Sequence, residues 1–153
     1  MPDQVRWIRS YVVQEDDEIL ALSQAAVERH HDRSFGAMVR VALAPCSPFS
    51  VTKELMIRSA ELAEKLDVRL HTHFAENSED DDFSIATFGC RPFEYLREVG
   101  WLSNRTWVAH CVMPNPEEIV QLGAAGIGAA FDEAAALDNC GLLVDRLSAI
   151  DAG

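Results

Sequence analysis

Two histidines and one glutamate, His71, His73 and Glu76, lie within six consecutive residues at the end of an apolar segment. Because side chains alternate along a strand, His71 and His73 share one face, and Glu76 follows just past the strand end. A neutral imidazole can bind a metal ion, and a nearby carboxylate can carry a proton to or from water on that ion. The alternative is that these polar residues have ordinary hydrogen-bond partners at a strand end. Their position favours a site, because parallel α/β folds place chemistry at the carboxyl ends of strands.

Other chemically competent side chains follow two further apolar segments. His110 interrupts the segment 106–112, and Cys46 lies in the loop after the segment 39–44. Cys46 either faces a site or is an ordinary loop residue, whereas Cys111 is expected to be a buried thiol. The four cysteines are far apart and form no CxxC pair, so we expect reduced thiols.

The hydrophobic pattern alternates between helical and strand periodicity along most of the chain. Alternation at this spacing predicts right-handed crossovers and a parallel sheet, so the carboxyl ends of the strands meet at one edge. Residues 1–13 show no clear period. Helices are predicted over 15–30, 52–66, 92–99, 115–122 and 134–150, and strands over 39–44, 68–73, 106–112 and 126–131.

Two connecting segments carry charge or capping signals. The acidic run 77–82 is predicted to be a solvated loop, because the alternating oxygen ligands and the glycine turn of a calcium loop are missing. A single helical turn is expected over 83–88. Asn115, Pro116 and Glu118 predict a helix start with an N-cap, a proline in the first turn and a capping box.

The charge balance excludes some classes of partner. The 153 residues carry a formal net charge of −12, which argues against binding to nucleic acid or to an anionic membrane. No apolar run reaches the roughly 18–20 residues that span a bilayer. Residues 1–4 lack the basic start and apolar core of a signal peptide, so we expect a cytoplasmic protein.

An ordered set of motifs resembles one enzyme family over about residues 12–130. The chain is similar to the amidohydrolase superfamily, in the branch of aminohydrolases that act on purine-like and triazine rings. Within this branch it most resembles 8-oxoguanine deaminase and the hydroxyatrazine and triazine hydrolases. The motifs are Ala44–Ser50, Leu70–Asn77, Phe88–Pro92, Gly100–Trp101 and Trp107–Val112.

This resemblance implies an α/β fold, a partial TIM-type (β/α) barrel of about four parallel strands with flanking helices. It implies one divalent ion per complete site, zinc or else iron or manganese, with His73 as a metal ligand. Glu76 would be the proton shuttle, and His110 would polarise the attacking water or the substrate. His71 and Cys46 are expected to line the pocket for a purine-like or triazine substrate.

The chain departs from the family in its metal ligands. The paired HxH of the first strand and the Asp of the eighth strand have no counterpart, and neither Asp132 nor Asp138 matches that Asp. One His ligand does not complete a catalytic zinc site, which normally has three protein ligands. We therefore expect residues 1–153 to be a single partial barrel domain with little or no deaminase activity alone. Its uncovered strand edges would favour association into oligomers.

Two other interpretations stay open at this stage. The first is a truncated or degenerate relative that folds without turnover, and the missing HxH favours it for this chain as it stands. The second is a generic α/β module that binds a small molecule, such as a flavodoxin-like fold. That module would need a glycine-rich phosphate loop after a strand, and the sequence has none.

Overall fold

A parallel four-stranded sheet forms the centre of the computed structural model, which describes residues 14–130. The strands lie in the order in which they follow along the chain, and every neighbouring pair is parallel. The predicted parallel α/β architecture is therefore confirmed. The helix predicted over 134–150 and the segment 1–13 lie outside the described residues. The strands are β1 (Ala42–Leu43), β2 (Arg69–Phe74), β3 (Thr106–His110) and β4 (Gly128–Ala130).

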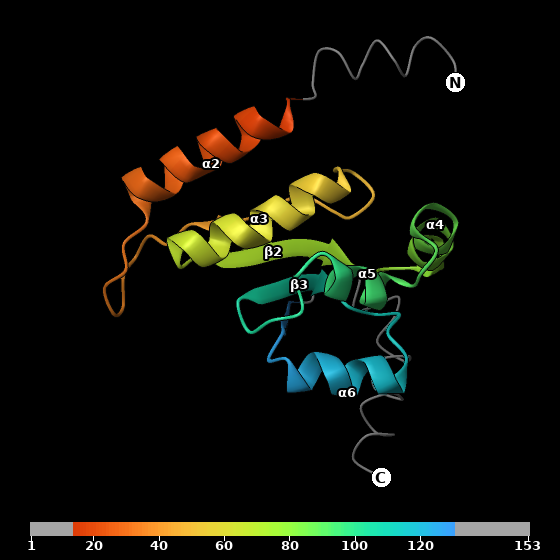
Figure 1. Ribbon diagram of the computed structural model, residues 1–153. Helices are drawn as coiled ribbons and strands as arrows, with labels where there is room; N and C mark the ends of the chain where they lie inside the picture. The colour runs from red at the N-terminus through yellow and green to blue at the C-terminus, as the bar shows by residue number, and fades with distance from the viewer. Residues whose placement is uncertain (1–13, 131–153) are drawn as a thin grey trace.

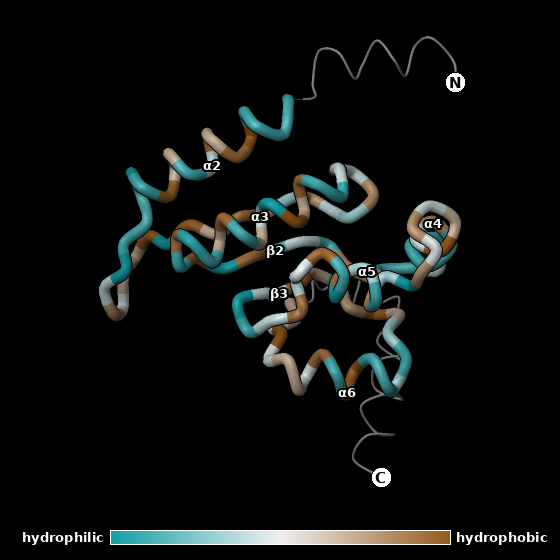
Figure 2. The backbone as a smooth tube through the Cα atoms, viewed as in Figure 1, coloured by the Kyte–Doolittle hydropathy of each residue, from teal (hydrophilic) through white to brown (hydrophobic). Residues whose placement is uncertain are grey.

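Helices connect successive strands, as right-handed crossovers require. Figure 1 shows α2 stacked on α3, α3 beside β2, and α4 beyond the arrowhead of β2, at the carboxyl end of the sheet. Hydrophobic and hydrophilic residues alternate along α3 (Figure 2), which buries one face and leaves the other in solvent. No helix among residues 14–130 is long and apolar enough to cross a membrane. The helices are α2 (Asp16–His30), α3 (Lys53–Leu66), α4 (Ser78–Phe88), α5 (Pro92–Glu98) and α6 (Pro116–Ala124).

The two faces of the sheet differ in burial. Along β2 the side chains of Leu70, Thr72 and Phe74 are buried, whereas His71 and His73 are only partly covered. This is the predicted alternation: the buried face packs into the hydrophobic core, and the other face carries the histidines. The register aligns His73 with Ala109 of β3, so residues of the same face lie side by side.

The amino-terminal end of the sheet is closed by satisfied hydrogen bonds. Trp101 is fully buried, and its indole N–H donates to the carbonyl of Met56 in α3 at 2.8 Å. The hydroxyl of Thr106, at the start of β3, donates to the carbonyl of Trp101 at 2.6 Å. Arg105 pairs with Asp67 at 2.7 Å and joins the starts of β2 and β3. These contacts fix the strands from which the other end of the sheet projects.

The prediction of a solvated loop over 77–82 is wrong. The segment forms the first turns of α4, because Asn77 caps the helix by accepting a hydrogen bond from the Asp80 amide at 3.2 Å. Acidic residues suit this position, since the amino-terminal end of a helix is electropositive. Asp81 is not solvated: its side chain is 17% exposed and pairs with Arg91. The helical turn predicted over 83–88 is present as the second half of α4, whereas the sequence expectation missed the first half of this helix and the ion pair.

Three predicted strands are longer than the structure shows. The segment 39–44 contributes only Ala42–Leu43, the strand predicted over 106–112 ends at His110, and that over 126–131 spans Gly128–Ala130. Hydrophobicity continues past His110, but the backbone there turns left-handed and leaves the sheet. The predicted capping box is confirmed, with Asn115 and Glu118 bonded reciprocally at the start of α6.

Candidate active site

Three side chains from two strand ends meet at the carboxyl edge of the sheet. The rings of His73 and His110 have centroids 5.3 Å apart. The Nε2 atom of His110 lies 3.7 Å from Oε2 of Glu76. The predicted convergence of His73, Glu76 and His110 is therefore present in the geometry, although their chemical roles stay predictions.

The His73 ring is oriented by a main-chain carbonyl. Its Nδ1 lies 2.6 Å from the carbonyl oxygen of Cys46, which can only accept a hydrogen bond, so Nδ1 carries the proton. The same oxygen accepts the His73 amide at 3.0 Å and the Thr72 hydroxyl at 3.3 Å. With Nδ1 protonated, the lone pair of His73 resides on Nε2. This arrangement, in which a carbonyl fixes the tautomer, is typical of metal-binding histidines.

His110 reaches this group because the strand alternation ends there. By register His110 aligns with Phe74 on the buried face, yet its ring lies next to the ring of His73. The backbone of His110 has a φ of 71°, which is unfavourable for a residue other than glycine. His110 is 8% exposed, and its Nδ1 has no hydrogen-bond partner among the described residues. Strained backbone and an unpaired buried nitrogen are both typical of functional positions.

His71 lies on the same face as His73 but farther from Glu76. Its ring stacks on Trp107, with centroids 3.6 Å apart, and its Nδ1 donates to the Trp107 carbonyl at 3.1 Å. The centroid of His71 is 6.0 Å from that of His73. This placement is consistent with a pocket-wall position, and binding of substrate by His71 stays a prediction.

The two cysteines near the site differ in their thiols. Cys46 is exposed, and its Sγ lies 3.9 Å from Nδ1 of His73. Its main chain contacts His73 more closely than its thiol does, so its contribution is the carbonyl that orients the ring. The Cys111 thiol is partly buried, and burial raises its pKa to about 11, which keeps it protonated at neutral pH. The expectation that Cys111 is a structural thiol agrees with this environment.

A small apolar pocket lies beside His73. Its volume is only about 10 Å³, enough for about one water molecule, and its lining includes Phe49 from the loop after β1 and Phe83 from α4. These two rings contact edge to face, with centroids 5.9 Å apart. The pocket as it stands is therefore too small for a heteroaromatic ring.

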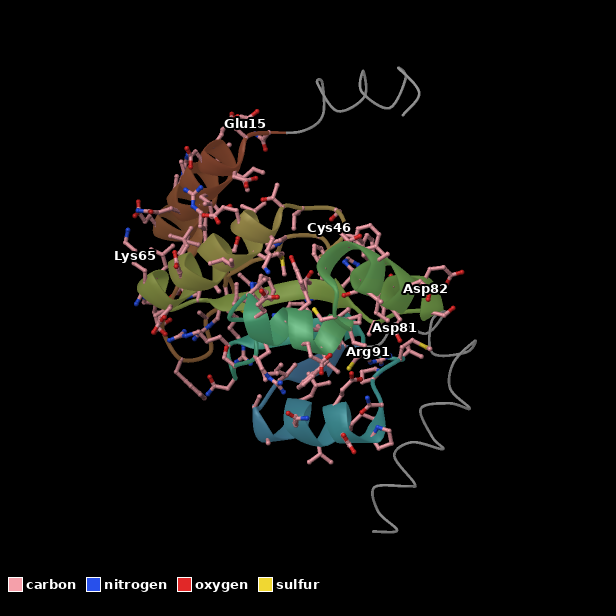
Figure 3. All side chains as sticks on the ribbon, turned by 45° about the vertical axis from the view of Figure 1, so that its right-hand side comes forward. Glu15, Cys46, Lys65, Asp81, Asp82 and Arg91 are labelled. Atoms are coloured by element: carbon pink, nitrogen blue, oxygen red, sulfur yellow. The ribbon has the colours of Figure 1, made fainter. Side chains whose placement is uncertain are left out.

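Arg91 joins the loops on either side of the site, and the sequence analysis assigned it no role. Its guanidinium binds Glu118 through Nε and Nη2, at 2.8 and 3.1 Å, and Asp81 through Nη1 at 2.5 Å. Figure 3 shows the labelled side chains of Asp81 and Arg91 next to each other. The hydrogen bonds that Arg91 donates to Glu118 raise the pKa of Arg91 above its ordinary value, so the guanidinium stays charged. A glutamate that is almost fully buried requires such a partner, but sequence alone does not identify the partner.

The residues present fit one ligand of a metal site rather than a whole site. His73 offers a free Nε2 lone pair, and the unpaired Nδ1 of His110 lies in the same group. Within residues 14–130, however, no group of three His, Cys, Asp or Glu side chains is arranged to hold an ion. An ion bound at His73 would need ligands beyond those that the structure describes.

Comparison with known proteins gives the family and the fold. The model of the amidohydrolase family matches residues 3–146. The chain is 55% identical over 116 residues to an 8-oxoguanine deaminase of Pseudomonas aeruginosa. This alignment covers 76% of this chain and 26% of that protein. It is 36% identical over 114 residues to a hydroxydechloroatrazine ethylaminohydrolase of a Pseudomonas species, covering 74% of this chain and 23% of that protein.

A solved structure shows the same arrangement of strands and helices. The atrazine chlorohydrolase of Arthrobacter aurescens TC1, complexed with zinc, superposes with a TM-score of 0.77 and 36% identity, covering 82% of this chain and 27% of that chain. The four parallel strands with flanking helices therefore form a partial TIM-type barrel. The chain spans about a quarter of the length of the curated relatives it matches. It belongs to the amidohydrolase family.

Proposed function

We propose that this chain supplies part of the active site of a metal-dependent deaminase that acts on a purine-like or triazine ring. The observation that carries the proposal is the convergence of Glu76, His73 and His110 at the carboxyl end of the sheet. A metal ligand, a proton carrier and a polarising imidazole are the parts that such a hydrolysis needs. The deaminases and ring hydrolases among its relatives support the same reaction class.

Each residue has a role that its geometry permits. His73 would hold the ion through Nε2, because Nδ1 donates to the Cys46 carbonyl. When bound, a zinc ion lowers the pKa of its water to about 7, and iron or manganese suits the same ligands. Glu76 would accept a proton from the attacking water and return it to the ring nitrogen. His110 would stabilise the charge that develops during attack.

The reaction balances as a hydrolytic exchange at one ring carbon. The bond between that carbon and its amino group breaks, and a bond to the water oxygen forms. One water proton ends on the ring nitrogen and the other on the departing ammonia. Glu76 is 43% exposed at its side chain, so its carboxylate is accessible to a substrate and to water.

The purine-like substrate is favoured over the triazine by sequence identity. The 8-oxoguanine deaminase is 55% identical over its aligned residues, whereas the triazine-acting relatives are 36% identical. Ammonia release from 8-oxoguanine is therefore the first activity to measure.

One observation favours a second candidate, a folded relative without turnover. The described residues hold no cluster of three metal-ligating side chains. In this alternative the chain keeps the family fold and the His73 environment but performs no chemistry. The two candidates differ in what the segment does inside a complete barrel.

A segment exchange tests the proposal. The 116 aligned residues of this chain would replace their counterpart in the Pseudomonas aeruginosa 8-oxoguanine deaminase. The chimera should bind zinc and release ammonia from 8-oxoguanine. Glu76→Gln should keep the metal but lower kcat by about 10³-fold, the scale of lost proton transfer. His73→Ala should lose the metal as well.

The matched control is Glu79→Gln, an exposed acid in the first turn of α4, three residues from Glu76. It should leave both the metal content and kcat unchanged. A folded chimera that binds zinc without turnover would support the non-catalytic alternative. Full activity of Glu76→Gln would remove Glu76 from the mechanism.

A further inference from the structure

Glu76 lies in the loop after β2, and His110 is the last residue of β3, from which the next loop starts; the two loops are joined by backbone bonds near the strands. The amide of Cys111 donates to the Phe74 carbonyl at 2.9 Å, and the amide of Met113 donates to the Ala75 carbonyl at 3.0 Å. These bonds hold strained backbone, because Ala75, like His110, has a positive φ, 48°. Strained segments persist only where surrounding contacts hold them.

The outer ends of the same loops meet at one guanidinium. On the Glu76 side, the Glu76 amide donates to Asp80 of α4 at 2.8 Å, and the neighbouring Asp81 binds Arg91. On the His110 side, Arg91 donates to the Met113 carbonyl at 3.3 Å and holds Glu118 by two hydrogen bonds. Arg91 itself is the N-cap residue of α5 and belongs to neither loop.

The burial of the partners makes this contact set specific. The side chains of Glu118 and Asp81 are 4% and 17% exposed. If Arg91 were lost, bulk water could not fully take over the hydrogen bonds that it gives to these two carboxylates. Glu118 also accepts the Asn115 amide at 2.7 Å and thereby fixes the start of α6. A planar guanidinium can serve two carboxylates and a carbonyl in fixed directions, whereas a lysine ammonium cannot present the same fork.

We infer that Arg91 is a positioning residue that, through Asp81 and Glu118, holds the Glu76 loop and the His110 loop at the separation the site needs. We name the three residues the Arg91 clasp. The role of this clasp in catalysis rests on the proposed function. Its effect on the distance between the two loops can be measured in this chain whether or not the proposed function is correct.

The competing explanation is an ordinary stabilising ion pair, and the chain offers a matched control. Arg105 is 35% exposed at its side chain, against 34% for Arg91, and it too binds a carboxylate and a main-chain carbonyl. It joins the same two strands at their opposite end. A general loss of stability would follow from replacing either arginine, whereas a change in site geometry should follow only from replacing Arg91.

The test is the nuclear Overhauser effect between the ring protons of His73 and His110 in the isotopically labelled 153-residue chain, without metal or substrate. The rings are close enough in the structure to give this cross-peak. Arg91→Gln should weaken it more than Arg91→Lys does, because the strand register and the bond from the Cys111 amide to the Phe74 carbonyl still keep the two rings near each other, while Arg105→Gln should leave it unchanged. An unchanged cross-peak intensity in Arg91→Gln, or an equal loss in Arg105→Gln, would overturn the inference.

A milder variant keeps the test decisive if Arg91→Gln does not fold. Asp81→Asn weakens only the contact on the Glu76 side, since Arg91 keeps Glu118. Amide exchange at Glu76 should then become faster, while exchange at Leu70, bonded to the Arg105 carbonyl, stays unchanged. Unchanged exchange at Glu76 would overturn the inference. If the Arg91 variants change the cross-peak as expected but the chimera is inactive, the result would count against the proposed function alone.

Discussion

The two ends of the sheet differ in how their polar groups and backbone are satisfied. At the amino-terminal end, Trp101 and Thr106 are buried with their polar atoms paired. The one left-handed residue other than glycine described there, Asp67, is a helix C-cap that tolerates this conformation. At the carboxyl end, left-handed backbone occurs at Ala75 and His110, and a buried ring nitrogen is unpaired. One end provides stability, and the other holds polar groups that a ligand or water could satisfy.

The largest expected effect compares Trp101, buried at the amino-terminal end, with Trp107 on the histidine face of the sheet. Trp101→Ala should lower the free energy of unfolding by about 4 kcal/mol, because it leaves a cavity and removes the bond to the Met56 carbonyl. Trp107→Ala, on the partly covered histidine face, should lower it by only about 2 kcal/mol. Urea unfolding followed by circular dichroism measures both. Equal losses would show that the histidine face contributes as much stability as the buried amino-terminal end.

A smaller effect tests the strain at the carboxyl end. Ala75→Val should lower the free energy of unfolding by about 2 kcal/mol, because a branched side chain fits neither the positive φ nor the buried position. The control is Ala129→Val on the exposed strand β4, where a branched residue suits regular strand backbone and the change should stay within about 0.5 kcal/mol. A neutral Ala75→Val would mean that the backbone there relaxes freely.

The smallest effect concerns the exposed ion pair at the amino-terminal end. The hydrogen bond from Arg105 lowers the pKa of Asp67 below its ordinary value. A carboxyl group whose pKa is lower in the folded state contributes stability above its unfolded pKa and loses it as the pH falls through the folded pKa. Arg105→Gln should therefore flatten the fall in stability between about pH 5 and pH 2, measured by urea unfolding. Parallel pH curves would contradict the pairing.

Most of the fold could be predicted from periodicity and capping residues. The helix starts at Thr52 and Asn115 carry local signals, since each side chain caps its own helix. The limits of β3 could not be predicted, because hydrophobicity continues through residues 111–112 while the backbone leaves the sheet at His110. The second half of α4 was predicted as a helical turn, but its start was missed because the acidic first turn resembles a solvated loop.

The site was predictable where its residues lie at the end of one strand and in the loop that follows it. His73 and Glu76 are close in sequence, so their spacing alone placed them together. The Arg91 clasp was not predictable, because Arg91 and Glu118 are 27 residues apart and meet only through tertiary packing. Likewise, a left-handed alanine has no local signal, since the intrinsic preference of the residue opposes it.

The hydrogen bond from His73 to the carbonyl of position 46 has a consequence for protein engineering. Every amino acid carries a main-chain carbonyl, so the residue at this position can be exchanged without deleting the group that sets the imidazole tautomer. The Cys46 side chain is exposed, so it can be changed without removing that carbonyl. Substitutions at position 46 should therefore alter the surroundings of the His73 ring while the ring keeps its orientation.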